Sequence, residues 1–175
     1  AAGTMAGLYV HVPFCFHKCH YCDFYSIVDS QDRQGAFTEA LIRELTRWAE
    51  RQPLQPRSIF VGGGTPTLLG RDHWERLLSA MGELEVLKQV EEFTVEANPE
   101  TVTPELLRVL AGGGVNRLSI GAQSFNRELL KTLERWHEPA SVEQAVDAAR
   151  AAGITDLNLD LIFAIPGQTQ AMLDE

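Results

Sequence analysis

The 175-residue sequence has few basic residues, no long apolar run and no cysteine outside one short segment. Lys and Arg number 15 against 24 Asp and Glu, and the net charge of −9 argues against binding nucleic acid through a general positive field. No run of about 18 apolar residues is present, so no membrane span is expected. Residues 1–7 lack a basic segment, and the apolar run at 8–12 is too short for a signal-peptide core. We therefore expect a cytoplasmic protein.

Short β-branched and apolar runs alternate with helical patterns along the chain. The predicted strands cover residues 8–12, 58–61, 93–96, 118–120 and 157–162. Each strand is followed by a helical crossover, and tight hairpins cannot join parallel neighbours, so the fold class is α/β with a parallel sheet. The pattern leaves open whether that sheet is flat or curled toward a barrel.

Apolar spacing and capping residues locate the helices between these strands. Trp48 lies on the apolar stripe of the first helix and is expected in the core. Later helices are expected to open at Asp72, Thr103 and Ser141. A shorter helix is expected near residues 126–133.

The three cysteines, Cys15, Cys19 and Cys22, lie on one short segment directly after the first predicted strand. With no other cysteine available for pairing, they indicate a ligand cluster and not a disulfide framework. Three thiolates on one loop suit a cubane iron–sulfur cluster whose fourth iron stays open. The alternative is a structural zinc site in which His17 or His20 supplies the fourth ligand.

A glycine-rich segment, residues 62–65, follows the second predicted strand. It has neither the lysine of a Walker A loop nor the glycine spacing of a dinucleotide fingerprint. Two interpretations stay open at this point. Its backbone N–H groups approach a ligand carboxylate, or the segment is a tight strand-to-helix turn that needs positive φ.

Two acids, Glu96 and Asp160, interrupt predicted strands, which is costly unless each is paired or binds a ligand. With Gln123 and Arg135 they could form a polar pocket for an amine, ribose hydroxyls and a carboxylate. The alternative for Glu96 is a structural ion pair with Arg117. The carboxyl ends of parallel strands are where α/β folds place their sites, so one composite site is expected.

The motifs together resemble a known family. They are Tyr9-Val-His-Val-Pro-Phe-Cys15, Cys19-His-Tyr21-Cys22, Gly62-Gly63-Gly64-Thr65-Pro66, Glu96-Ala-Asn-Pro, Leu118-Ser-Ile-Gly-Ala-Gln123 and Leu157-Asn-Leu-Asp160. In this order, from about residue 8 to residue 169, they are similar to the radical S-adenosylmethionine (SAM) family. The similarity is to the branch that contains HemW haem chaperones and oxygen-independent coproporphyrinogen III oxidases.

The resemblance implies a parallel partial (β/α) barrel of radical SAM type. It implies an incomplete core domain over residues 8–175, truncated after about five strands. We expect residues 1–7 to be a flexible N-terminus. A [4Fe-4S] cluster on the three cysteines and SAM would be its cofactors. The residues that the resemblance assigns to SAM are Tyr9, Tyr21, Gly63, Gly64, Thr65, Glu96, Gln123, Arg135 and Asp160.

Within this branch the oxidases carry a further cysteine where this sequence has Phe24, after Asp23. The resemblance therefore implies a haem chaperone, with haem or porphyrin as cargo, a haem-acceptor protein and an electron donor. The alternative is oxidative decarboxylation of coproporphyrinogen III. We also expect self-association through a truncated sheet edge, because the fifth strand ends beside apolar Leu159, Leu161 and Phe163.

Overall fold

The computed structural model describes residues 6–174, and within them five parallel strands form the main sheet. They are β1 (Gly7–Val12), β4 (Ser58–Gly63), β5 (Glu92–Ala97), β6 (Arg117–Gln123) and β7 (Asp156–Leu161). Spatial order follows chain order, and each neighbouring pair is parallel. A separate parallel pair joins β2 (Phe14–Cys15) to β3 (Ile27–Val28). The predicted α/β class is confirmed.

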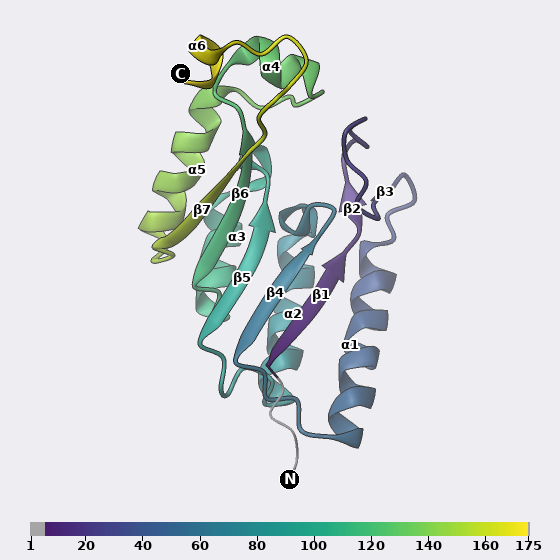
Figure 1. Cartoon of the computed structure of the whole chain (residues 1–175). Coiled ribbons are helices and arrows are strands. Elements are labelled where there is room, and N and C mark those ends of the chain that lie inside the picture. Colours follow the sequence, from purple (N-terminus) through teal and green to yellow (C-terminus); the bar gives the residue numbers. More distant parts are fainter. Residues whose placement is uncertain (1–5, 175) are drawn as a thin grey trace.

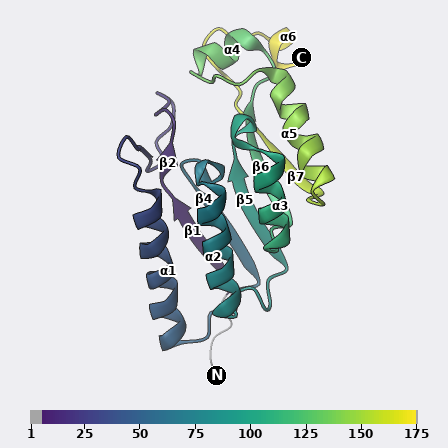
Figure 2. The ribbon, with the colours of Figure 1, turned by 180° about the vertical axis from the view of Figure 1, so that it is seen from behind.

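The longer described helices pack on one face of the sheet (Figures 1 and 2). They are α1 (Gln34–Arg51), α2 (Arg71–Glu83), α3 (Pro104–Gly112) and α5 (Pro139–Ala151). The short helices are α4 (Arg127–Thr132), α6 (Gln170–Leu173) and two 3-10 turns at Pro66–Leu68 and Pro99–Thr101. The other sheet face is turned to the viewer in Figure 1, with no described helix in front of it.

Apolar and polar side chains alternate along the strands, which explains why the helices cover only one face of the sheet. Ile59, Val95 and Leu118 point to the helices and are fully buried, against Trp74 of α2 and Leu107 of α3. Each such side chain contributes roughly 1.5–3 kcal/mol through burial. The residues between them in sequence are largely polar and occupy the open face, because successive side chains of a strand alternate between faces.

The predictions for Trp48 and Asp72 are wrong. Trp48 is 47% exposed and lies beside the Arg51 guanidinium, because α1 is the outermost helix of its layer (Figure 2). Asp72 does not cap α2, whose N-cap is Gly70. The Asp72 carboxylate instead accepts hydrogen bonds from its neighbour Arg71.

The other predicted helix starts have different outcomes. Thr103 caps α3 as predicted, since its hydroxyl accepts the Leu106 N–H at 3.2 Å. The predicted start at Ser141 is wrong: α5 begins at Pro139, whose fixed φ and missing N–H suit a first helical position. Asn126 caps the short helix α4 through its side-chain oxygen.

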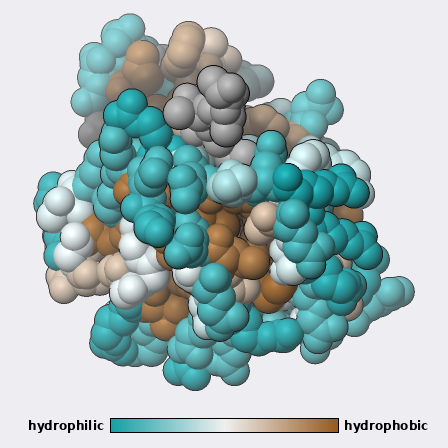
Figure 3. Space-filling view, turned by 90° about the horizontal axis from the view of Figure 1, so that it is seen from below, coloured by the Kyte–Doolittle hydropathy of each residue, from teal (hydrophilic) through white to brown (hydrophobic). Residues whose placement is uncertain are grey.

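The two ends of the sheet differ in chemistry. The end seen from below in Figure 3, where the strands begin, is mostly hydrophilic with apolar groups toward its middle. The cysteine loop and α4 lie at the opposite end, beyond the carboxyl ends of the strands (Figure 1). Of the predicted flexible segment, residues 1–5 lie outside the described residues, and Gly7 already belongs to β1. Among the helices of residues 6–174, none has the length and apolar character to cross a membrane.

Candidate functional site

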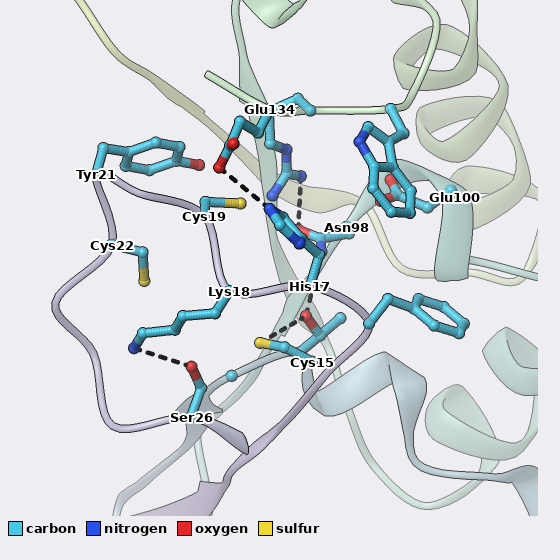
Figure 4. Close-up of a pocket in the computed structure, with 15 residues that line it drawn as sticks. Cys15, His17, Lys18, Cys19, Tyr21, Cys22, Ser26, Asn98, Glu100 and Glu134 are labelled. Atoms are coloured by element: carbon cyan, nitrogen blue, oxygen red, sulfur yellow. Dashed lines mark hydrogen bonds and ion pairs between the residues drawn. The ribbon is translucent and has the colours of Figure 1, made fainter. Parts of the chain in front are cut away.

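A cavity of about 430 Å³ lies between the cysteine loop and the carboxyl ends of the strands (Figure 4). Its walls come from four separate parts of the chain: the loop after β2, the turn after β4, the turn after β5 and the segment after α4. The lining residues are Cys15, Phe16, His17, Lys18, Cys19, Tyr21, Cys22, Ser26, Gly64, Thr65, Asn98, Glu100, Glu134, Arg135 and Trp136.

The three thiols lie on one wall of this cavity, and each is partly exposed and free of a disulfide. A turn closes the loop, with the Cys22 N–H donating to the Cys19 carbonyl at 3.1 Å. The Lys18 ammonium crosses the loop and donates to the Ser26 hydroxyl at 3.1 Å and to the Phe24 carbonyl. These contacts hold a segment without regular structure in one shape.

The glycine-rich segment docks against the start of the cysteine loop. The Gly64 N–H donates to the Val12 carbonyl at 2.8 Å, and the Thr65 N–H donates to the Phe14 carbonyl at 2.7 Å. A Cβ on Gly64 would lie 2.6 Å from the Phe14 carbonyl oxygen, and Gly63 has φ of 119°. The backbone N–H groups of this segment therefore have protein acceptors, which supports the interpretation as a tight turn.

Glu96 lies at the end of β5 on the open face of the sheet. Its carboxylate accepts the Gly63 N–H at 3.1 Å, and a Cβ on Gly62 would come within 2.7 Å of it. Burial raises the pKa of Glu96, and the Asp160 carboxylate adds to the rise. The Gly63 hydrogen bond and His11 act in the opposite direction.

The alternative ion pair between Arg117 and Glu96 is not formed. The Arg117 guanidinium lies 3.4 Å from the Asp156 carboxylate across β6 and β7. Asp160, four residues further along β7, accepts hydrogen bonds from the Ser119 hydroxyl at 2.9 Å and from the Asn158 amide at 2.7 Å. Both predicted in-strand acids thus have hydrogen-bond donors on the open face.

Arg135 is the cation of the site. One terminal nitrogen donates to the Asn98 side-chain oxygen at 2.7 Å and to the Gly121 carbonyl at 3.1 Å. The Asn98 amide in turn donates to the Thr65 hydroxyl at 3.1 Å. The Nε of Arg135 is buried and has no hydrogen-bond partner among the described residues, a costly arrangement that an added acceptor would relieve. As a lining residue of the cavity, Arg135 also supplies a positive charge that can pair with a carboxylate ligand.

The thiol and phenol groups near Arg135 have shifted acidities. Burial raises the pKa of the Cys19 thiol, and Arg135 opposes this rise. Burial also raises the pKa of Tyr21 to about 12, again against the influence of Arg135. A nearby cation favours the thiolate form that binds metals.

The donor set fits an iron–sulfur cluster. Cubane cysteines bind separate irons and need not converge on one ion. Within residues 6–174, no three His, Cys, Asp or Glu side chains are grouped closely enough to hold a single metal ion. The His17 and His20 rings, the expected closing ligands of the zinc alternative, instead contact the Glu134 carboxylate at 3.1 and 2.9 Å.

The structure brings the predicted residues together in two groups. The cavity group is Cys15, Cys19, Cys22, Tyr21, Gly64, Thr65 and Arg135. The remaining residues, Tyr9, Gly63, Glu96, Gln123 and Asp160, do not line that cavity. They lie on β1, β4, β5, β6 and β7, and the Glu96 side chain contacts Gly63 and is electrostatically coupled to Asp160 and Tyr9.

Gln123 and Tyr9 have well-defined local surroundings. Gln123 ends β6 with φ of 63°, and its side chain occupies the space that a Cβ on Gly121 would fill. The Tyr9 hydroxyl is 2.9 Å from Nδ1 of His11. Burial raises the pKa of Tyr9, and Glu96 adds to the rise.

Asn98, Glu134 and Trp136 were not among the predicted site residues. A signal was available for Asn98, which lies two positions after Glu96 in the strand-end motif, at the carboxyl end of the sheet. Glu134 and Trp136 flank Arg135, but the sequence around them carries no pattern that marks a site.

A family model described as Radical SAM superfamily matches residues 9–175. The chain belongs to this superfamily. Among the relatives of this radical SAM chain, the heme chaperone HemW of Lactococcus lactis subsp. lactis (strain IL1403) is 44% identical over 94% of the chain and 43% of its own length. The oxygen-independent coproporphyrinogen III oxidase of Bradyrhizobium diazoefficiens is 35% identical over 97% of the chain and 38% of its own length.

The solved structure of coproporphyrinogen III oxidase (HemN) from Escherichia coli, a radical SAM enzyme, superimposes with a TM-score of 0.86. It is 30% identical, and the match covers 98% of this chain and 40% of HemN. The radical SAM chain thus spans less than half the length of these relatives. The resemblance to the branch of HemW and coproporphyrinogen oxidases is confirmed.

Proposed function

We propose that the chain binds a [4Fe-4S] cluster through Cys15, Cys19 and Cys22, with SAM beside it, as part of a HemW-like haem chaperone of the cytoplasm. The observation that carries the proposal is that the three thiols and Arg135 line the same cavity. The sequence similarity to HemW proteins supports the haem assignment.

Each group of residues has a distinct proposed task toward SAM. The Arg135 guanidinium binds the carboxylate, while Gly64 and Thr65, at the end of the turn that begins at Gly63, shape the wall next to it. Acceptors for the amine and the ribose hydroxyls come from the remaining polar residues on the open face, Glu96, Gln123 and Asp160. Tyr9 and Tyr21 supply aromatic rings at the border of the proposed SAM site. When bound, the cluster supplies one-electron chemistry to SAM, for which a separate electron donor is needed.

Haem is proposed as cargo that passes to an acceptor protein, and Phe24 at the position after Asp23 favours this reading over the oxidase. The second candidate function is oxidative decarboxylation of coproporphyrinogen III. It is favoured by the 30% identity and TM-score of 0.86 to the Escherichia coli oxidase.

Anaerobic purification with iron and sulfide analysis tests the cofactor proposal. We expect about four irons and four sulfides per chain, and a paramagnetic resonance signal of the reduced cluster that changes when SAM is added. The Cys19→Ser variant should lose the cluster, while Ser30→Ala, which changes an exposed residue outside the cavity, should keep it. About one zinc without iron would overturn the proposal in favour of a structural zinc site.

Haem titration followed by absorbance separates the two functions. A chaperone gives a saturable Soret band and no protoporphyrinogen, whereas the oxidase forms protoporphyrinogen and 5′-deoxyadenosine from coproporphyrinogen III under anaerobic conditions. Absence of a Soret band above background would contradict the chaperone assignment.

A further inference from the structure

Glu134 joins the cysteine loop to the segment after α4. Its carboxylate contacts Nε2 of His17 at 3.1 Å (Figure 4). It also accepts a hydrogen bond from the His20 backbone N–H at 3.1 Å and contacts Nδ1 of His20 at 2.9 Å. These two histidines flank Cys19 on either side. The hydrogen bond from His17 and the N–H of His20 lower the pKa of Glu134, so the carboxylate is the acceptor form.

Glu134 holds this position with an unfavourable backbone conformation. Its φ is 56°, in the left-handed region that non-glycine residues adopt only where their surroundings fix them. The backbone is held by the Glu134 N–H to the Lys131 carbonyl at 3.0 Å and the Arg135 N–H to the Leu130 carbonyl at 2.8 Å. These two hydrogen bonds end α4 in a Schellman motif, which fixes the backbone of Glu134 directly after the helix.

The residues that follow contact the strand ends in turn. Arg135 donates to Asn98 after β5 and to Gly121 in β6, and His137 lies 3.1 Å from the Ala122 carbonyl through its Nε2. Residues 134–137 therefore connect the loop that carries the thiols with the strand ends that carry the polar residues.

We propose that Glu134 is a positioning residue that fixes the cysteine loop relative to Arg135, so that a cluster on the thiols and SAM on Arg135 are held in register. The proposal rests on the proposed function for its ligands. The restraint that Glu134 places on the cysteine loop, which we call the brace, needs no ligand. Glu134 touches neither ligand in this assignment and acts through His17 and His20.

Differences in exposure show which contacts of Glu134 matter most. The His20 ring is 89% exposed, and its pair with Glu134 is weakened by solvent screening. His17 is 37% exposed and stacks on Trp136, with ring centroids 5.4 Å apart and an interplanar angle of 25°. The His17 contact and the backbone N–H of His20 are therefore the main restraints on the loop.

Alkylation of the thiols tests the brace without any cofactor. In the cluster-free full chain, we expect iodoacetamide to modify Cys19 in Glu134→Ala about tenfold faster than in the wild type, as loss of a hydrogen bond to a charged group predicts. Glu134→Gln keeps an acceptor and should restore most of the protection. Glu143→Ala, which removes an exposed carboxylate from α5, is the matched control and should react like the wild type.

The same variants with the reconstituted cluster test the consequence for SAM. We expect Glu134→Ala to release iron to a chelator about tenfold faster and to show a smaller change of its resonance spectrum on SAM addition, with a thermal midpoint lowered by no more than a few degrees. Thiol and iron-release rates equal to the wild type would overturn the brace. A wild type that holds no cluster but shows the alkylation difference would overturn the proposed function and leave the brace standing.

Discussion

Glu96 carries a charge that its surroundings disfavour. Burial and Asp160 raise the pKa of Glu96, so the folded state binds the proton more tightly than the unfolded chain does. This contribution to stability therefore declines as pH rises from the ordinary glutamate value of 4.5 through the folded value. We expect Glu96→Gln, which keeps an acceptor for the Gly63 N–H, to be more thermally stable than the wild type at neutral pH.

The measurement is the thermal midpoint of both proteins between about pH 4.5 and about pH 8. The advantage of Glu96→Gln should grow with pH across this window, while Glu143→Gln on the exposed face of α5 should follow the wild type. A gain that is constant with pH would contradict an electrostatic cause.

The grouping of the three cysteines on one loop could be predicted from the sequence because their spacing is local, whereas the residues that hold this loop could not. Asn98 reaches Thr65 across 33 positions, and Glu134 reaches His17 across 117. Such contacts depend on sheet order and on one left-handed backbone position, neither of which periodicity reveals. Arg135 was predicted as part of a polar pocket and again through the family resemblance, and the structure adds its hydrogen bonds to Asn98 and Gly121.

The capping of α2 and α3 provides a test at the scale of single elements. Thr103→Ala removes the hydroxyl that accepts the Leu106 N–H and should lower the free energy of unfolding by about 1 kcal/mol. Asp72→Ala removes an exposed first-turn acid that makes no side-chain cap and should cost less than about 0.5 kcal/mol. Urea unfolding of both variants measures the difference. Equal losses would contradict the assigned caps.

Element type was easier to predict than element boundaries. The strands follow from apolar runs whose inward residues are completely buried, such as Ile59 and Leu118. The start of a helix depends on which of several polar residues caps a free backbone N–H. At α2 the N-cap is Gly70, two positions before the expected Asp72. Trp48 had the right spacing for the core, but its helix has no further helix on its outer side (Figure 2).

The whole molecule has a layer of helices on one sheet face and a polar surface on the other. The described helices leave Glu96, Ser119 and Asp160 on the open face, near the carboxyl end that holds the thiols. This arrangement gathers the polar residues where the proposed SAM site needs them. It also leaves the last strand of the sheet with a single strand neighbour among residues 6–174.

That strand, β7, is hydrogen-bonded to β6 and carries Leu161 at 57% exposure, next to Phe163 at 76%. An uncovered edge with apolar side chains is a template for pairing with a second copy. We expect the average mass from light scattering to rise with protein concentration. Leu161→Lys should suppress this rise, because a charge on an edge strand disfavours pairing.

Trp48→Lys is the matched control, since Trp48 is 47% exposed but lies on α1, at the other side of the sheet (Figure 1). It should associate like the wild type, which separates edge pairing from general hydrophobic attraction. Equal suppression by both variants would attribute association to exposed apolar surface of any kind. A wild type that remains a monodisperse monomer at high concentration would contradict pairing through β7, because the unpaired N–H and C=O groups of that edge would then be satisfied by water alone.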